Sequence, residues 1–195
     1  MARTESTMLE LGTIAPQFDL PDVSTDKRIT RGEPGDAKAL LVAFISPHCP
    51  FVKHVQNEVA AIGEEYVRKG VNIVAISAND AVAYPDDAPE NLRSFAAGLG
   101  LAFPLLYDES QETARAYRAA CTPDFFLFDG NLRLVYRGQL DDSRPKSDTP
   151  VTGADLRAAL DAVLAGRPVS AEQRASIGCN IKWKAGHEPD YFNPA

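Results

Sequence analysis

Apolar and polar residues alternate along the chain in a way that predicts strands and helices in turn. Residues 39–45 (ALLVAFI) form a continuous apolar run, which is typical of a strand buried on both faces. In residues 50–69 apolar side chains recur at every third or fourth position and Gly70 follows, which predicts an amphipathic helix. Residues 71–78 (VNIVAISA) repeat the buried-strand pattern. Strand, helix and strand in this order form a βαβ unit, so we expect a partly parallel sheet.

Shorter elements are predicted on both sides of this unit. Turn-forming residues and short alternating pieces indicate a small hairpin within residues 12–36. Beyond the second strand we predict helices over 91–99, 110–121 and 152–166, a strand over 103–107, and a hairpin over 125–136 that turns at 129–131. The segment after Pro168 holds the only tryptophan, and we expect it to lie back on the domain.

The length of 195 residues favours one α/β domain over two independent ones. We place its core at about residues 37–166 on the basis of the predicted elements. An N-terminal extension (1–36) and a C-terminal tail (167–195) complete the single domain 1–195.

The composition is that of an ordinary soluble protein, with 45% hydrophobic residues, 24% charged residues and a net charge of −7. Lys and Arg are scattered, so neither nucleic acid nor an anionic membrane is expected as a partner. The longest apolar run, 39–45, is far shorter than the roughly 20 residues that span a bilayer. The first eleven residues contain no sustained apolar stretch that would serve as a secretion signal. We therefore expect a cytoplasmic protein.

The three cysteines are Cys49, Cys121 and Cys179. They are too few and too widely spaced for the disulfide scaffold of a small secreted protein, which favours a reducing compartment. Their odd number leaves at least one cysteine unpaired in a monomer.

Cys49 is the first candidate for chemistry because it lies at a predicted strand-to-helix junction. At that position a sulfur atom faces free backbone N–H groups and the positive end of the helix dipole, which lower the thiol pKa. His48 and Lys53 add positive charge nearby. Because a thiolate attacks disulfides and peroxides, we predict that Cys49 is a nucleophile. The alternative interpretation is an inert cysteine at a strand end.

No metal site and no cofactor are expected. His48, Cys49 and His54 are potential ligands, but their spacing does not put them on one helix face and no fourth ligand is indicated. The acidic residues of the loop 79–90 lack the spacing of a calcium-binding loop, so we interpret them as solvated. These residues are Asp80, Asp86, Asp87 and Glu90.

Several segments, taken in order, are similar to a known family. Phe44-x-x-Pro47-x-Cys49 resembles the active-site segment of thioredoxins, and Thr122-Pro123 before FFLFD resembles their cis-proline loop. The segments PHCPFVKH, AYPDDAPEN and SIGCNIKWK extend the match over nearly the whole chain. Together they resemble the peroxiredoxin-like branch of the alkyl hydroperoxide reductase and thiol-specific antioxidant superfamily. This resemblance implies a thioredoxin fold, in which helices flank a central mixed β-sheet, with an N-terminal hairpin extension and a C-terminal tail.

The chain departs from the patterns of this superfamily around Cys49. A thioredoxin has its second cysteine three residues after the first, where this chain has Val52. Ser46 stands three residues before Cys49, which is the spacing of the serine or threonine that precedes a peroxidatic cysteine. The peroxidatic position itself, however, aligns with Val52.

Together with the resemblance, the position of Cys49 predicts a thiol–disulfide oxidoreductase in which the Cys49 thiolate attacks a disulfide, and His48 and Lys53 tune its ionisation. Pro47, Thr122 and Pro123 are then expected to shape a groove where a substrate backbone pairs with an exposed sheet edge. The implied partners are disulfide-containing proteins or small thiol substrates and a thiol electron donor, and the oligomeric state is open.

Resolution of the mixed disulfide needs a second thiol. Cys121 is the first choice, because the cis-proline loop of this fold lies against the start of the active-site helix. Cys179 and an external thiol remain alternatives.

Two other functions also remain open. One is a weak thiol-dependent peroxidase, an antioxidant protein in which Ser46 orients the peroxide. The other is a redox-inactive thioredoxin-like binding module that uses the same groove.

Overall fold

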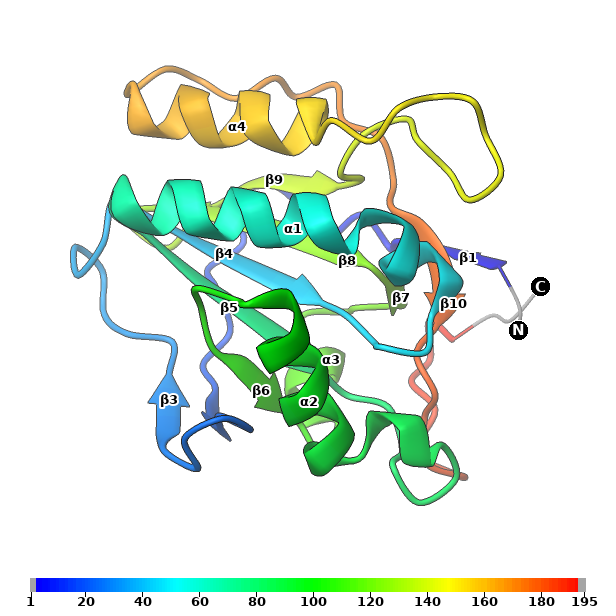
Figure 1. The fold of residues 1–195 in the computed structure, drawn as a ribbon. Helices are drawn as coiled ribbons and strands as arrows, with labels where there is room; N and C mark the ends of the chain where they lie inside the picture. The colour runs from blue at the N-terminus through cyan, green and yellow to red at the C-terminus, as the bar shows by residue number, and fades with distance from the viewer. Residues whose placement is uncertain (1–2, 193–195) are drawn as a thin grey trace.

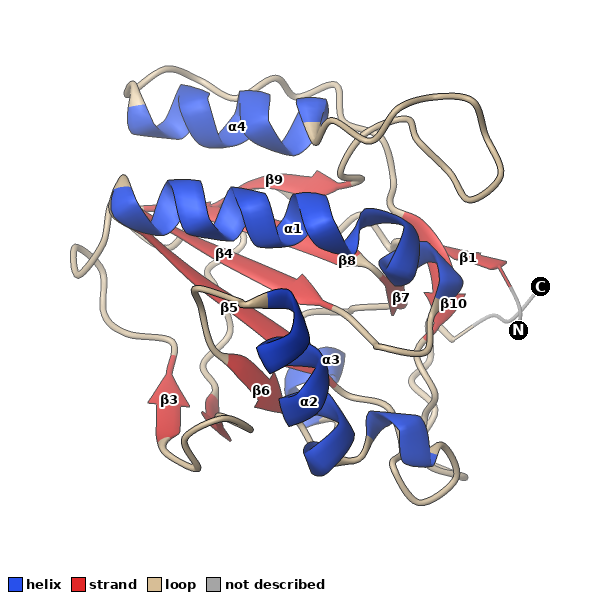
Figure 2. Cartoon of the chain, viewed as in Figure 1, coloured by secondary structure: helices blue, strands red, loops and turns tan. Residues whose placement is uncertain are grey.

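The computed structural model describes residues 3–192, and a five-stranded mixed sheet lies at its centre (Figures 1 and 2). The strand order is β6-β5-β4-β8-β9, with β4, β5 and β6 parallel and β8 and β9 antiparallel to them. The strands are β4 (Ala39–Phe44), β5 (Val71–Ser77), β6 (Leu105–Tyr107), β8 (Asp124–Asp129) and β9 (Leu134–Gly138). The parallel pairing of β4 with β5 confirms the predicted βαβ unit.

Strand β4 is buried along its whole length because both faces of the sheet are covered. Successive side chains of a strand point to opposite faces, so β4 supplies two separate apolar clusters. Leu41 belongs to the first cluster, while Leu40 and Val42 belong to the second. This explains why residues 39–45 read as an unbroken apolar run rather than an alternating one.

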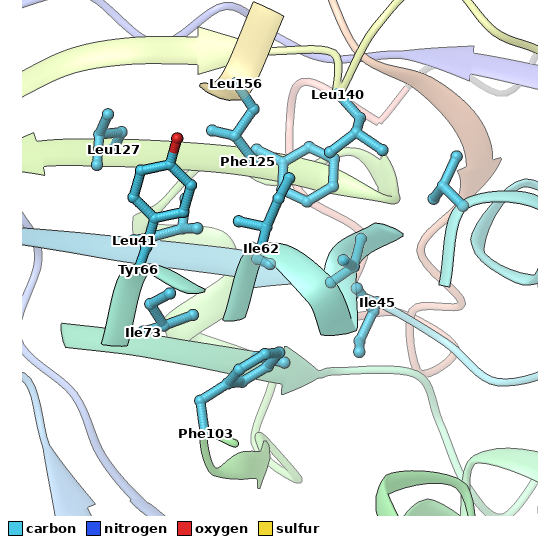
Figure 3. Packing of buried hydrophobic residues seen from close by; sticks show 14 of the residues in the cluster. Leu41, Ile45, Ile62, Tyr66, Ile73, Phe103, Phe125, Leu127, Leu140 and Leu156 are labelled. Carbon is cyan, nitrogen blue, oxygen red and sulfur yellow. The ribbon is translucent and has the colours of Figure 1, made fainter. Parts of the chain in front are cut away.

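Helices α1 (Pro50–Arg68), α2 (Pro89–Leu99) and α4 (Ala154–Leu164) contribute to the cluster on one face of the sheet. Figure 3 shows Ile62 and Tyr66 of α1 packed among residues of the strands and of α4. Phe103 approaches α1 so closely that a Cβ at Gly63 would lie 2.1 Å from its ring. The predicted amphipathic helix is therefore confirmed, and its glycine has a packing role.

The opposite face is covered by α3 (Glu112–Ala116), the N-terminal extension and the tail. The extension contains the predicted hairpin, formed by β2 (Asp19–Pro21) and β3 (Arg28–Thr30). Trp183 of the tail is buried in this second cluster, which confirms that the tail lies back on the domain.

A small three-stranded antiparallel sheet joins the two ends of the described chain to its middle. Its central strand β10 (Ile177–Asn180) lies between β1 (Arg3–Glu5) and β7 (Cys121–Thr122). The prediction of one helix over 110–121 is wrong here. Helix α3 ends at Ala116, and Arg118 takes a left-handed φ of 50°. The chain then extends into β7 because its backbone groups pair with the tail, a long-range interaction that local periodicity does not register.

No helix within residues 3–192 is long and apolar enough to cross a membrane.

Candidate active site

Cys49 is the N-cap residue of α1, as the predicted strand-to-helix junction required. Its backbone is extended (φ −69°, ψ 121°), and Pro50 occupies the first turn of the helix. The Cys49 carbonyl accepts the first helical hydrogen bond from the Lys53 amide at 3.0 Å. An N-cap side chain faces the free amides of the first turn, so the sulfur lies where a negative charge is favoured.

The cis-proline loop lies directly against this sulfur. The peptide bond between Thr122 and Pro123 is cis, as the resemblance implied. The Cys49 thiol donates a hydrogen bond to the Thr122 carbonyl, with 3.1 Å between sulfur and oxygen. Predicted residues from two distant segments therefore meet at one point of the fold.

Cys179 of β10 is the second thiol at this point. It pairs with Thr122 across the β7–β10 ladder, and it shares the first apolar cluster with Cys49. Hydrogen bonding with the Cys179 side chain is the largest influence that lowers the pKa of Cys49 below its ordinary value. Burial opposes this shift, while Thr122 and the backbone of Val52 add to it. The same contact, together with burial, raises the pKa of Cys179, so the two shifts favour Cys49 over Cys179 as the thiol that ionises first.

Cys121, the neighbour of Thr122, has hydrogen-bond partners other than Cys49. Its sulfur is within 3.7 Å of the Pro123 carbonyl oxygen and 3.9 Å of that of Ser176. Burial is the main cause that raises its pKa well above the ordinary value. The thiol that acts on Cys49 by hydrogen bonding is thus Cys179 rather than Cys121, our first choice for the resolving residue.

The sheet edge expected to receive a substrate is already paired. Strand β10 runs antiparallel to β7 and places Cys179 opposite Thr122. The expectation of an exposed edge at Thr122 is therefore wrong for this arrangement, because the tail of the chain occupies that edge. Cys49 is consequently 0% exposed beneath the tail and the loop.

His48 is held by a buried network. Its Nδ1 lies 2.5 Å from a carboxylate oxygen of Asp87 and 3.1 Å from the Ser46 hydroxyl. The imidazole also stacks on Tyr84, with ring centroids 6.0 Å apart. Asp87 further accepts hydrogen bonds from Asn79 at 3.0 Å and from Ser77 at 3.4 Å. These contacts fix the orientation of His48 at the start of α1.

The interpretation of Asp87 as a solvated loop residue is wrong. Its side chain is completely buried, since the short helix η1 (Pro85–Asp87) turns it inward towards His48 and Asn79. Asp86 next to it is exposed, as expected.

Lys182 is a cation near the site that sequence reasoning missed. It is buried, and its Nζ donates to the backbone and side-chain oxygens of Asn180 at 2.7 and 2.9 Å. Its charge lowers the pKa of Cys179, against the larger influences that raise it. The Asn79 side chain accepts a hydrogen bond from the Lys182 amide at 2.8 Å, which links the tail to the His48 network. The sequence points to this part of the site only through the family resemblance of two segments, AYPDDAPEN and SIGCNIKWK. That resemblance indicates the segments but not the contacts between them.

Two hollows lie near the buried sulfur. One is lined by Pro47, His48, Lys53, Asp86 and Asn91. Another is bordered by the cis-proline and the start of α1, with Pro123, Phe51, His54 and Val55 among its lining residues. Residues 3–192 contain no group of three or more His, Cys, Asp or Glu side chains able to hold a metal ion.

Comparison with known proteins places this geometry in a family. A crystal structure of an uncharacterized conserved protein from Geobacillus kaustophilus has 54% sequence identity and a TM-score of 0.92, covering 94% of this chain and 97% of that one. The thiol-disulfide oxidoreductase ResA of Geobacillus thermodenitrificans is 29% identical over 134 residues, which are 66% of this chain and 68% of that protein.

A more distant structure identifies the fold. A thiol:disulfide interchange protein from Chlorobium tepidum, described as a thioredoxin family protein, has 17% identity and a TM-score of 0.60, covering 80% of this chain and 98% of that one. This likeness confirms the thioredoxin fold. Residues 11–137 match the AhpC/TSA family. The match takes in β4, the junction at Cys49 and the cis-proline loop, and the chain therefore belongs to the AhpC/TSA family.

Proposed function

We propose that this protein is a thiol–disulfide oxidoreductase whose nucleophile is the Cys49 thiolate. The observation that carries the proposal is the position of the Cys49 sulfur at the start of α1, where hydrogen-bond partners lower its pKa. A thiolate rather than a thiol is the species that attacks a disulfide. The name of the ResA relative supports the same class of reaction.

In the proposed reaction the Cys49 thiolate attacks one sulfur of a substrate disulfide. A Cys49–substrate disulfide forms, the substrate S–S bond breaks, and the other substrate sulfur leaves as a thiolate. The substrates are disulfide-containing proteins or small disulfides, and a thiol donor returns the protein to its reduced state. Pro47 and Pro123, which line the two hollows, are the proposed substrate contacts.

Access to Cys49 requires a local opening, because its side chain is 0% exposed. Strand β10 covers the position opposite Thr122, so separation of β10 from β7 frees both the sulfur and a sheet edge. A substrate backbone pairs with that edge in the opened state.

Reduction of insulin and of a glutathione mixed disulfide tests the proposal. Wild type is expected to reduce both, and Cys49→Ser is expected to lose the activity. Cys121→Ser is the matched control, because it removes a buried thiol whose hydrogen-bond partners are the carbonyl oxygens of Pro123 and Ser176. Equal activity of wild type and Cys49→Ser would remove Cys49 from the reaction.

Membership of the AhpC/TSA family supports a second candidate, a thiol-dependent peroxidase with an antioxidant role. Peroxide would then oxidise Cys49 to a sulfenic acid. Ser46 is the residue expected to orient the peroxide. Its hydroxyl forms a hydrogen bond with Nδ1 of His48 rather than with the Cys49 sulfur. Mass spectrometry after stoichiometric hydrogen peroxide distinguishes the candidates, because absence of a sulfenate or derived disulfide at Cys49 excludes the peroxidase.

A cytoplasmic location stays part of the proposal, to be tested by cell fractionation.

A further inference from the structure

We propose that Cys179, on strand β10, is the second redox-active cysteine, which resolves the mixed disulfide at Cys49 by closing an intramolecular Cys49–Cys179 disulfide. This inference rests on the proposed nucleophilic role of Cys49. It replaces both Cys121 and an external thiol as the group that completes the first half of the reaction.

Cys49 and Cys179 both lie against Thr122. The Thr122 carbonyl accepts a hydrogen bond from the Cys49 sulfur at 3.1 Å, and Thr122 is also the residue directly opposite Cys179 in the β7–β10 ladder. The Cα atoms of directly paired residues in antiparallel strands, here Thr122 and Cys179, lie about 4.5–5.5 Å apart. Cys49 and Cys179 also belong to the same buried cluster, in which Cys121 takes no part. Figure 1 shows β10 beside the first turn of α1, where Cys49 lies.

Hydrogen bonds hold the tail against the segment 120–123 on both sides of Cys179. Before it, the Ser176 hydroxyl donates to the Pro123 carbonyl at 2.5 Å. After it, the Ile181 amide donates to the Ala120 carbonyl at 3.0 Å. Close approach at Gly178 adds to this, because a Cβ there would lie 1.9 Å from the Thr122 carbonyl oxygen. In the closed arrangement β10 holds Cys179 opposite Thr122, so the return of β10 to β7 after attack on a substrate brings Cys179 back to the Cys49–substrate disulfide.

The ionisation of the pair suits two successive steps. While Cys49 carries the negative charge, its hydrogen bond and its charge both hold the pKa of Cys179 above the ordinary value. Once Cys49 is joined to a substrate sulfur its charge is gone, and both influences disappear. Burial, which raises the pKa of Cys179, and the charge of buried Lys182, which lowers it, both remain. The pKa of Cys179 is therefore lower after Cys49 has reacted than before.

The step is balanced as a thiol–disulfide exchange. Cys179 gives up its proton to solvent, and its thiolate attacks Cys49 Sγ in the mixed disulfide. The bond from Cys49 to the substrate sulfur breaks, the Cys49–Cys179 bond forms, and the substrate leaves as a second thiolate. Over both steps one disulfide is reduced to two thiols while the two cysteines are oxidised. A dithiol reductant then returns the protein to its starting state.

A single-turnover experiment with the full chain tests this assignment. Fully reduced protein, freed of reductant, is mixed with one equivalent of oxidised glutathione, and the glutathione released and the protein mass are measured. Wild type is expected to release two glutathiones per protein and to carry none, and peptide mapping is expected to join Cys49 to Cys179. Cys179→Ser is expected to release one glutathione and to retain the other on Cys49. Cys121→Ser is expected to behave as wild type.

Serine at 179 keeps a hydroxyl as hydrogen-bond partner for Cys49, so it removes the resolving sulfur with the least change to the nucleophile. Mapping of the wild-type disulfide gives an answer that needs no variant. A Cys49–Cys121 disulfide, or unchanged release of the second glutathione by Cys179→Ser, would overturn the role of Cys179 but leave Cys49 as the nucleophile. If instead Cys49→Ser reacts like wild type, the proposed function itself fails.

Discussion

Gly178 lies so close to Thr122 that a Cβ at Gly178 would be only 1.9 Å from the Thr122 carbonyl oxygen. The contacted atom is backbone and accepts the hydrogen bond from Cys49, so it cannot move aside without disturbing the site. This contact explains why the segment before Cys179 carries a glycine although its backbone is an ordinary strand.

Gly178→Ala is therefore expected to separate β10 from β7. The pKa of Cys49 should rise, because its largest stabilising partner is carried away, and the tail should become more sensitive to proteolysis. Thiolate absorbance against pH and limited proteolysis measure the two effects. Gly98→Ala is the matched control, since a Cβ at Gly98 meets nothing within 4 Å. Identical behaviour of the two variants would show that β10 tolerates the added methyl group in place.

The thiolate of Cys49 gives a second prediction. Hydrogen bonding with Cys179 lowers the pKa of Cys49, so wild type should hold a thiolate at pH values well below the ordinary cysteine pKa of about 8.5. Cys179→Ala should move the midpoint of this titration upwards. Cys179→Ser should move it less, because the hydroxyl still donates a hydrogen bond.

Ultraviolet thiolate absorbance measures these midpoints without requiring a reagent to reach the buried sulfur. Subtraction of the Cys49→Ser titration assigns the signal to Cys49. Cys121→Ser should leave the midpoint unchanged, since Cys121 is not among the groups that lower the pKa of Cys49. A midpoint near the ordinary value in wild type would support a redox-inactive binding module over either enzyme.

The buried His48–Asp87 pair gives a third prediction. Asp87 accepts from Asn79 and Ser77 and lies 2.5 Å from the His48 ring nitrogen. In Asp87→Asn one carboxylate oxygen becomes an NH2 group, which cannot accept a hydrogen bond from the donors around it. We therefore expect a loss of about 1–3 kcal/mol in the free energy of unfolding. Exposed Asp86 is the control, because Asp86→Asn should change this free energy by less than about 0.5 kcal/mol. Urea unfolding measures both, and equal effects at the two positions would contradict the assigned role of Asp87.

The predicted elements that the structure confirms are those with a strong local signal. The run 39–45 and the apolar spacing in 50–69 depend on side chains a few positions apart, so a single sequence reveals β4, α1 and the junction at Cys49. The cis-proline loop at Thr122-Pro123 is predicted by its resemblance to the loop of thioredoxins, and the structure confirms it.

The contacts that complete the site depend on pairing between distant segments. Nothing local in residues 177–180 indicates a strand opposite Thr122, and nothing in the polar loop around Asp87 indicates that one of two adjacent aspartates is buried against His48. The helix predicted over 110–121 is wrong for the same reason, because the pairing of β7 with β10 overrides local propensity. Proximity to the cis-proline in the sequence favours Cys121 as the resolving residue, whereas the register of β7 and β10 puts Cys179 opposite Thr122.

Packing at Gly63 gives a fourth prediction. A Cβ at this helix position would lie 2.1 Å from the Phe103 ring, so Gly63→Ala forces the ring or the helix to move. We expect a loss of about 1–3 kcal/mol in the free energy of unfolding, in spite of the better helix propensity of alanine. Gly98→Ala, also in a helix but in open space, should instead gain up to about 1 kcal/mol. Denaturant unfolding tests this difference in sign.

Asp124 gives the last prediction, which concerns stability against pH. It follows the cis-proline, is fully buried, and burial raises its pKa to about 7. The unfolded chain has an ordinary aspartate pKa of about 3.9, so between these values the folded state binds a proton that the unfolded state has released. The stabilising contribution is complete below about pH 4 and is lost as the pH rises through about 7.

Asp124→Asn keeps the shape of the side chain and removes its titration. Between about pH 4 and 7 the ionisation of Asp124 should lower the unfolding free energy of wild type by about 1.4 kcal/mol for each unit of pKa shift. The Asp124→Asn variant should lack this contribution. Urea unfolding at several pH values measures the two curves. Parallel curves would mean that Asp124 ionises normally in the folded protein. Curves that diverge as the pH rises, with the asparagine variant the more stable, would identify Asp124 as a carboxyl group that the fold keeps protonated beside β7.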